Sequence, residues 1–337
     1  MTGTRTAKIP YVCVGLGTFL LVLAGLLAWY VTPRAERTSI DVDVTTVFTG
    51  TGSYFDTDKV KTVDDQRLTI TRQVRGDVAE SEKSGRAVWD VTTSVDTDTS
   101  LPASDPHDAL QWTLERWVVD RATNAPVHCC GERPAFEGEA YLKFPFHVQK
   151  RTYTWWDNTL GATVPLRFDG TTKVQGYEGY RFVGTVAPTR TGSRQVPGAI
   201  VGQPGKKQVL AEEWYANHRV ELVADQRTGR VLYAAIGPRK TLRAPGSTKT
   251  AAVLLDSQKI AFTPATQRAQ VALARDDNDR LTLLGTTLPI GAGALGALLV
   301  AAGIVLVVRG RGGREEPDGP GRPDPDSSPT TLETSTM

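Results

Sequence analysis

Two adjacent cysteines, Cys129 and Cys130 in the stretch VHCCGE, are the side chains of this sequence best suited to chemistry. The chain has only three cysteines, so a neighbouring pair stands out. Such a pair can close a disulfide, exchange with other thiols or give sulfur ligands to a metal. The choice among these depends on the compartment, because disulfides persist where the surroundings are oxidising.

Metal and catalytic chemistry find little further support. The sequence has four widely spaced histidines: His107, His128, His147 and His218. None pairs with another at metal-ligand spacing, and His128 with the two cysteines gives three consecutive residues, a poor tetrahedral zinc set. The sequence also lacks a G-x-S-x-G elbow, a P-loop, an H-E-x-x-H pair and a Rossmann fingerprint after a strand. It predicts no metal, no cofactor and no catalytic residue, so we do not expect an enzyme.

The densest group of aromatic residues lies between residues 141 and 160. Its main members are Phe144, Phe146, Tyr153, Trp155 and Trp156. Such side chains can either fill a core or line a binding groove. A core position is the better interpretation, because aromatic clusters usually anchor packing.

Two uncharged apolar segments must position these residues relative to a membrane. Residues 9–33 and 282–308 are each long enough to cross a hydrocarbon core of roughly 30 Å. A cleaved signal peptide is the alternative for the first segment, but its apolar region is longer than usual and no clear A-x-A-like site follows it. The sequence therefore predicts two transmembrane helices.

Basic residues beside these segments predict their orientation. Arg5 and Lys8 precede the first segment, and Arg309, Arg311 and Arg314 follow the second. Lys and Arg are retained on the cytoplasmic side of a membrane. We therefore expect a two-pass protein of the cell membrane with both termini in the cytoplasm and the main domain extracytoplasmic.

This orientation bears on the cysteine pair. An extracytoplasmic location is oxidising, and Cys13 lies within the first apolar segment, so Cys129 and Cys130 are expected to form a disulfide with each other. Adjacent α-carbons are about 3.8 Å apart, closer than the usual range of about 4.4–6.8 Å, so the bond is expected to be strained. Its expected role is to rigidify the turn before Gly131, with redox sensing as the alternative.

Alternation of apolar and polar residues predicts the architecture between the two segments. Runs such as RLTITRQV and HRVELVAD are typical of antiparallel strands, and no long helical pattern separates them. We expect a β-rich α+β domain, with an antiparallel sheet arranged as a half-barrel or as two related sheets. Residues 50–56 are interpreted as a mobile turn and residues 187–207 as a loop suited to insertions.

The expected layout has five parts: a cytoplasmic N-terminus at 1–8, a transmembrane helix at 9–33, the β-rich domain at 34–280 with a helix near 264–280, a second transmembrane helix at 282–308, and a disordered cytoplasmic tail at 309–337. The tail is rich in Pro, Gly, Ser and Asp and has little to bury.

The charge balance limits the partners. The chain has 39 Lys plus Arg against 37 Asp plus Glu, which offers no general electrostatic attraction to nucleic acid. The membrane is the expected partner, with an envelope lipid or glycolipid, an envelope protein or a second copy of the chain as further candidates.

Three blocks of sequence carry a family resemblance: FPFHVQKRTYTWWDNTL, VQGYEGYRFVGTVAP and TGRVLY, set between the two apolar segments. Together with DRATNAPVHCCGE, they resemble the actinobacterial porin PorA-like membrane protein family, over nearly the whole chain except the tail. The stretch VELVADQRTG departs from the Trp-Val-Glu-Pro-type stretch expected before the Thr-Gly turn. The family name implies a channel.

The residues favour a different role. A transmembrane β-barrel needs strands of about 9–11 residues with an apolar outer face, whereas the predicted strands are short and carry charges. We therefore expect a membrane-anchored, non-catalytic envelope domain with a binding or structural role, in which an acyl chain or glycolipid is a candidate ligand. The alternatives are an oligomeric porin or transport component and an envelope enzyme with an unrecognised site.

Overall fold

The computed structural model describes residues 8–100 and 108–311. His107 and most of the expected cytoplasmic ends lie outside the described residues. Backbone contacts divide the chain into two units, one of Met1–Ala28 with Thr287–Met337 and the other of Trp29–Thr286. The first unit is a pair of apolar helices and the second is a β-rich domain.

The helical unit consists of α1 (Ile9–Leu26) packed against α5 (Leu288–Arg311). A Cβ atom added at Gly17 would lie 2.7 Å from the carbonyl oxygen of Gly296, and one added at Gly296 would lie 2.8 Å from the carbonyl oxygen of Gly17. Only glycine permits so close an approach of two helix backbones, a common device in apolar helix pairs.

The helices extend beyond this pair. After α1 come a π-helical turn (Leu27–Val31) and α2 (Thr32–Ala35), whereas α5 is preceded by α4 (Pro264–Thr282) and a second π-helical turn (Leu283–Thr287). Two helical stretches, Ile9–Ala35 and Pro264–Arg309, are thus long and apolar enough to cross a membrane. The helix expected near 264–280 therefore continues directly into the second apolar segment.

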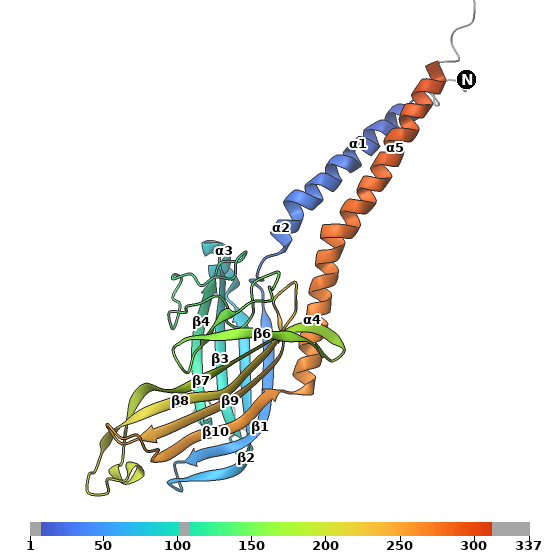
Figure 1. Cartoon of the computed structure of the whole chain (residues 1–337). Coiled ribbons are helices and arrows are strands. Elements are labelled where there is room, and N and C mark those ends of the chain that lie inside the picture. Colours follow the sequence, from blue (N-terminus) through green and yellow to red (C-terminus); the bar gives the residue numbers. More distant parts are fainter. Residues whose placement is uncertain (1–7, 101–107, 312–337) are drawn as a thin grey trace, which may run out of the picture. The chain divides into compact units, whose positions relative to one another are not determined.

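Antiparallel strands dominate the other unit. The described residues form one ten-stranded sheet in the order β4-β3-β2-β1-β10-β9-β8-β7-β6-β5 (Figure 1). The strands are β1 (Asp43–Asp56), β2 (Lys61–Gly76), β3 (Ala87–Thr97), β4 (Gln111–Val119), β5 (Tyr153–Asp157), β6 (Ala162–Val174), β7 (Tyr177–Val196), β8 (Val209–Ala224), β9 (Val231–Arg243) and β10 (Ala252–Phe262). A short helix α3 (Val78–Ser84) and a 3-10 turn (Gly198–Val201) complete the elements. The prediction of a β-rich α+β fold with an antiparallel half-barrel is confirmed.

The chain fills this sheet in two runs, one from the centre to an edge and one from the opposite edge back to the centre. It begins at β1, runs by hairpins to the edge strand β4, crosses to the opposite edge at β5, and returns by hairpins to β10 beside β1. The crossing segment, residues 120–152, is largely irregular and bridges both edges, pairing Arg133 with Arg116 of β4 and Ala140 with Trp155 of β5. It therefore covers parts of both edges of the sheet.

Side-chain contacts show how strongly the sheet curves. Lys240 of β9 donates a hydrogen bond to Gln111 of β4, five strands away in the sheet order. On a flat sheet these strands would be about 24 Å apart, given a strand spacing of about 4.8 Å. The sheet must therefore curl into a half-barrel with both side chains on its concave face.

Two expectations about irregular segments are wrong. Residues 50–56 belong to β1, where a Cβ atom at Gly50 would lie 2.2 Å from the carbonyl oxygen of Lys259. The glycine serves close strand approach and not a mobile turn. Residues 187–207 are also not one loop, because β7 continues to Val196 and is paired with β8 to its end.

Candidate functional site

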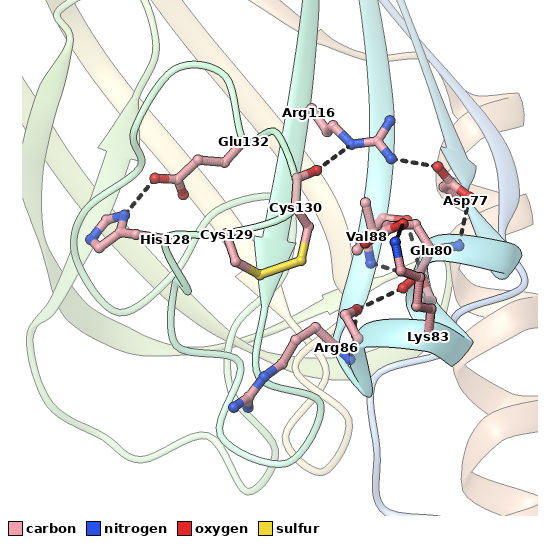
Figure 2. Close-up of a disulfide and its surroundings, with 12 residues drawn as sticks. Asp77, Glu80, Lys83, Arg86, Val88, Arg116, His128, Cys129, Cys130 and Glu132 are labelled. Atoms are coloured by element: carbon pink, nitrogen blue, oxygen red, sulfur yellow. Dashed lines mark hydrogen bonds and ion pairs between the residues drawn. A yellow bond between two sulfur atoms is a disulfide. The ribbon is translucent and has the colours of Figure 1, made fainter.

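The predicted disulfide between Cys129 and Cys130 is present (Figure 2). Cys13 in α1 is a free thiol. The pair lies in the irregular crossing segment. Cys130 and Gly131 both adopt left-handed backbone conformations, with φ of 59° and 74°. This places the bridge at a tight change of chain direction, as expected for a turn before Gly131.

Arg116 attaches this turn to the sheet. Its Nε donates to the carbonyl oxygen of Cys130 at 2.9 Å, and one terminal nitrogen donates to both carboxylate oxygens of Asp90, at 2.9 and 3.2 Å. Its other terminal nitrogen contacts Asp77, the N-cap of α3 (Figure 2). The backbone N–H of Glu80 and the Arg116 guanidinium lower the pKa of Asp77. One arginine thus joins β3, β4, α3 and the disulfide turn.

The described histidines each contact a carboxylate. His128 lies 2.6 Å from Glu132, His147 lies 2.8 Å from Glu36, and His218 lies 3.7 Å from Asp256. The described residues contain no group of three or more His, Cys, Asp or Glu side chains arranged to hold a metal ion. Each of the three described imidazoles thus faces a carboxylate in the structure.

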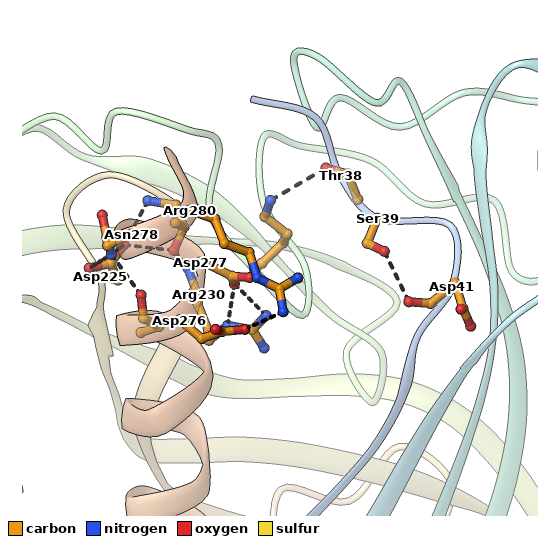
Figure 3. A network of polar contacts seen from close by, with 12 residues as sticks. Thr38, Ser39, Asp41, Asp225, Arg230, Asp276, Asp277, Asn278 and Arg280 are labelled. Atoms are coloured by element: carbon orange, nitrogen blue, oxygen red, sulfur yellow. Dashed lines mark hydrogen bonds and ion pairs between the residues drawn. The ribbon is translucent and has the colours of Figure 1, made fainter. Parts of the chain in front are cut away.

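A buried carboxylate organises the turn between β8 and β9 (Figure 3). Asp225 is 2 % exposed and accepts hydrogen bonds from the backbone N–H and the hydroxyl of Thr228 at 2.7 and 2.6 Å. The hydroxyl of Tyr177 donates to it at 2.6 Å, and the amide of Asn278 on α4 donates to it at 3.2 Å. Burial and the Asp225 carboxylate raise the pKa of Tyr177. The turn is therefore fixed to β7 and to α4.

The same turn also contacts the start of the domain. Arg227 donates to Glu36, with nitrogen to oxygen distances of 3.1 and 3.3 Å, and to Thr282 at 3.2 Å. Burial would raise the pKa of Glu36, but hydrogen bonds from His147 and Arg227 outweigh it and lower the pKa. Arg230 binds Asp277 at 2.7 Å. Together these contacts join the β8–β9 turn to the segments that lead to both apolar stretches.

The aromatic residues singled out in the sequence have different positions. Phe144, Tyr153 and Trp156 are buried, whereas Trp155 is half-buried and packs against both of the largest apolar clusters. Phe146 is also half-buried, with the ammonium of Lys143 4.0 Å from its ring centroid. Most members of the set are thus buried in the apolar clusters.

A belt of polar side chains crosses the concave face beside these aromatics. Glu115 of β4 is 3 % exposed and accepts hydrogen bonds from Tyr141, at 2.5 Å, and from Asn158. Asp157 accepts one from Tyr215 at 2.9 Å. With the Lys240–Gln111 hydrogen bond, these contacts join β4 to the β5–β6 turn, β8 and β9 across the half-barrel.

Two lysines of this domain lie where burial disfavours the charged form of their ammonium groups. Burial lowers the pKa of Lys143 to about 7, helped by Arg230, and burial lowers that of Lys240 to about 8. Among the described residues, the ammonium of Lys143 donates a single hydrogen bond, a long one of 3.4 Å to the hydroxyl of Thr38. Sequence reasoning missed both lysines. Lys240 lies on an alternating strand, where it is indistinguishable from a solvent-facing lysine until the cross-sheet contacts are known. Lys143 lies in the irregular crossing segment, which has no periodicity that would predict burial.

Fold and site together define a class: a β half-barrel domain with a packed concave face, in a chain that also carries two helices long and apolar enough to cross a membrane. Comparison with protein-family models matches residues 9–305 to the family Porin PorA. The chain therefore belongs to the Porin PorA family, and the resemblance proposed from sequence is confirmed. Comparison with curated proteins gives no significant match. Membership and the half-barrel indicate a membrane protein with a porin-like role in the cell envelope.

Proposed function

We propose that this protein acts in the envelope as a non-catalytic binding or structural module, and that a single copy does not form the pore. The observation that carries the proposal is the filled concave face of the half-barrel. Phe144, Phe182 and Tyr153 pack there with ring centroids 4.7–5.6 Å apart, and the polar belt of Glu115 and Lys240 crosses it. Packed side chains leave no wide aqueous path along that face.

The helix pair supports the same conclusion. A water-filled pore needs polar or ionisable side chains along its wall. Apart from Tyr11 near the start of α1 and Arg309 near the end of α5, the described side chains of these two helices are apolar or small, and the helices touch through glycine backbones. A channel would then require several copies, which keeps an oligomeric porin as the second candidate function because the family carries that name.

Conductance in planar bilayers tests this proposal. Full-length protein should give no channels when it is added at a concentration where it is monomeric in detergent. The oligomeric candidate is supported if channels arise only from an oligomeric fraction and if the conductance rises more steeply than linearly with protein concentration. Channels from a verified monomer would overturn the proposal.

We further propose the two-pass arrangement with both termini cytoplasmic and the half-barrel extracytoplasmic. It is supported by the two apolar helical stretches and by the flanking basic residues. A reporter fused after Met337 should read cytoplasmic, and one inserted at the exposed turn Pro204–Gly205 should read outside. Gly192 and Ser193, at the start of the expected loop, are unsuitable for insertion because they lie within β7. An outside signal from the C-terminal fusion would contradict the arrangement.

A lipid or glycolipid is the ligand class that we propose for the module. A domain held at a membrane meets lipid headgroups at high local concentration. Because the concave face is filled by side chains, we expect the lipid to bind on another surface of the domain. Native mass spectrometry of the full chain released from detergent should show co-purified lipid. Protein that carries no lipid, and that shows no mass shift after incubation with envelope lipid extract, would exclude this ligand class.

A further inference from the structure

A groove of about 460 Å³ lies on three neighbouring strands, away from the sites described above. It is lined by Pro165, Arg167 and Asp169 of β6, by Val183, Gly184 and Thr185 of β7, and by His218 and Arg219 of β8. Three of these side chains can carry positive charge. Asp169 is the one carboxylate of the lining, and it is paired with Arg181 at 2.8 Å.

A β-bulge brings two of the basic side chains to the groove. Gly184 pairs with Val220 and Val186 with Asn217, so Thr185 alone faces the two residues His218 and Arg219. Successive side chains of a regular strand alternate between faces. Here both are exposed, between a buried Asn217 and a buried Val220. Bulges commonly redirect side chains in this way next to functional sites.

The bulge is supported from the interior. Asn217 is 1 % exposed, its side-chain oxygen accepts a hydrogen bond from the backbone N–H of Gly237 at 2.9 Å, and its side-chain nitrogen donates to Tyr215 at 3.1 Å. A Cβ atom at Gly237 would lie 2.8 Å from the carbonyl oxygen of Gln258. A buried amide and a close strand contact thus fix the bulge, so its outer side chains start from a defined backbone.

The basic side chains of the groove differ in how far acidic neighbours neutralise them. Arg219 is paired with Glu221 at 3.0 Å and His218 contacts Asp256 at 3.7 Å, whereas Arg167 has no acidic partner among the described residues. Arg167 is exposed on the neighbouring strand. The lining therefore presents guanidinium groups from two strands, an imidazole and the hydroxyl of Thr185, but only one carboxylate of its own.

We propose that this groove binds a phosphoryl group. A phosphoryl group offers more acceptor oxygens than a carboxylate and is recognised by arginine in forked geometry. The inference rests on the proposed binding role and places the contact on the β6–β8 face of the domain. The phosphoryl group belongs either to a lipid headgroup or to free phosphate, and the experiment separates these two sources.

The test is ³¹P line broadening on the full chain in a phosphate-free detergent. The probes are inorganic phosphate and a short-chain, water-soluble phosphatidylglycerol, each at constant ionic strength. Wild-type protein should broaden at least one of the two signals. Arg167→Gln with Arg219→Gln should weaken binding about tenfold or more, because a hydrogen bond to a charged group contributes about that factor.

A matched control exists on β7. Arg194 also pairs with a glutamate, Glu213, and its side chain is 60 % exposed against 57 % for Arg219, but it lies outside the groove lining. Arg194→Gln should broaden the signal as wild type does. Arg167→Glu is the second variant; it reverses an exposed charge without breaking a described ion pair, so loss of binding there does not reflect misfolding.

Each outcome decides the inference. Broadening by phosphatidylglycerol alone assigns a lipid headgroup, and broadening by inorganic phosphate assigns free phosphate. No broadening in the wild type, or equal loss in Arg194→Gln and in the groove variants, overturns the inference. Lipid that still co-purifies with Arg167→Glu in native mass spectrometry would overturn the groove as its headgroup site while leaving the proposed binding role intact.

Discussion

At the scale of single residues, two aspartates show that burial changes how much the same aspartate turn contributes to stability. Asp120 and Asp225 each follow a strand and accept hydrogen bonds from the backbone N–H and hydroxyl of a threonine three residues later. Asp120 is half-buried, whereas Asp225 is fully buried and also binds Tyr177 and Asn278. Asp120 also contacts Arg86, but both of these side chains are partly exposed, whereas the contacts of Asp225 form a buried junction between separate elements.

Replacement of these aspartates should therefore cost different amounts. We expect Asp225→Ala to lower the free energy of unfolding by about 3 kcal/mol or more, because it leaves buried donors unpaired. Asp120→Ala is the matched control and should cost about 1 kcal/mol. Urea unfolding of the two variants measures the difference. Equal losses would show that Asp225 is only a local turn residue.

The lysine on the concave face should make stability depend on pH. Burial lowers the pKa of Lys240 from 10.5 to about 8, so between these values the unfolded chain holds a proton that the folded chain lacks. The contribution of Lys240 to the free energy of unfolding then rises with pH through this window, and the full cost of its charge is present below about pH 8.

Lys240→Met should remove this dependence. Relative to wild type, the variant should gain most at pH 7 and lose its advantage by about pH 10. Urea unfolding at pH 7, 8, 9 and 10 gives the difference between the two proteins, in which the other titrating groups cancel. Lys249→Met, an exposed lysine, should show no such trend. Parallel curves for Lys240→Met and wild type would contradict the pKa assignment.

The cysteine pair can be tested by counting the thiols that react with iodoacetamide. Denatured, unreduced protein should take one iodoacetamide, on Cys13, and reduced protein should take three. With Cys13→Ser the numbers should fall to none and two. Because the bridged loop is so short, Cys129→Ser with Cys130→Ser should cost about 1 kcal/mol or less of stability. Three adducts without reduction would show that the pair is free.

At the scale of elements, alternation predicted that strands exist but not how they are ordered. Runs such as residues 67–74 read correctly as strands because polar and apolar residues alternate within one hairpin. Neither the pairing of β1 with β10 nor the crossing from β4 to β5 has a local signal, because each joins residues far apart in the chain. The glycines of β1 misled for the same reason: Gly50 and Gly52 lie against backbone carbonyls of Lys259 and Asp256, which belong to the last strand.

The candidate site was predictable to a similar extent. The cysteine pair follows from composition and compartment, and the buried aromatics follow from their density. The junction at Asp225 and the groove at Arg167 and Arg219 do not, because each is assembled from strands that become neighbours only in the folded sheet.

The helix pair can be tested by a crosslink. A Cβ atom at Gly293 would lie 3.7 Å from that of Ala24, within the range of a disulfide, so Ala24→Cys with Gly293→Cys should crosslink on oxidation in a Cys13→Ser background. Adding Gly17→Leu should suppress the crosslink, since Gly17 touches the facing helix. Gly15→Leu is the control, because a Cβ there meets no atom within 4 Å. Equal crosslinking in both variants would contradict the glycine contact.

At the scale of the whole molecule, the first and last strands of the domain meet at the centre of the sheet. Phe48 of β1 lies opposite Phe262 of β10, with ring centroids 4.5 Å apart. Each strand continues toward one of the apolar helical stretches. The two halves of the sheet are therefore two meanders, β1 to β4 and β5 to β10, joined along this one antiparallel pair and by the crossing segment.

A chain that stops before β10 should show how much the pairing of β1 with β10 contributes to stability. A truncation after Thr250 leaves β1 and β9 as open edges and removes the partner of Phe48. We expect it to be digested by trypsin at least tenfold faster than the full chain, because unpaired edges and an open core are accessible. A truncation at Arg309, which keeps β10 and α5, is the control. Equal resistance of both would show that the meanders are stable alone.

The order of synthesis then matters for how this domain is made. β1 leaves the ribosome early, yet its second neighbour arrives some two hundred residues later, so contacts at the centre of the sheet have a large sequence separation and a high cost of loop closure. Until then β1 is an exposed edge strand with unpaired backbone groups, to which a chaperone or another nascent chain can bind. The sheet can therefore be completed only after β10, its last strand, has been synthesised.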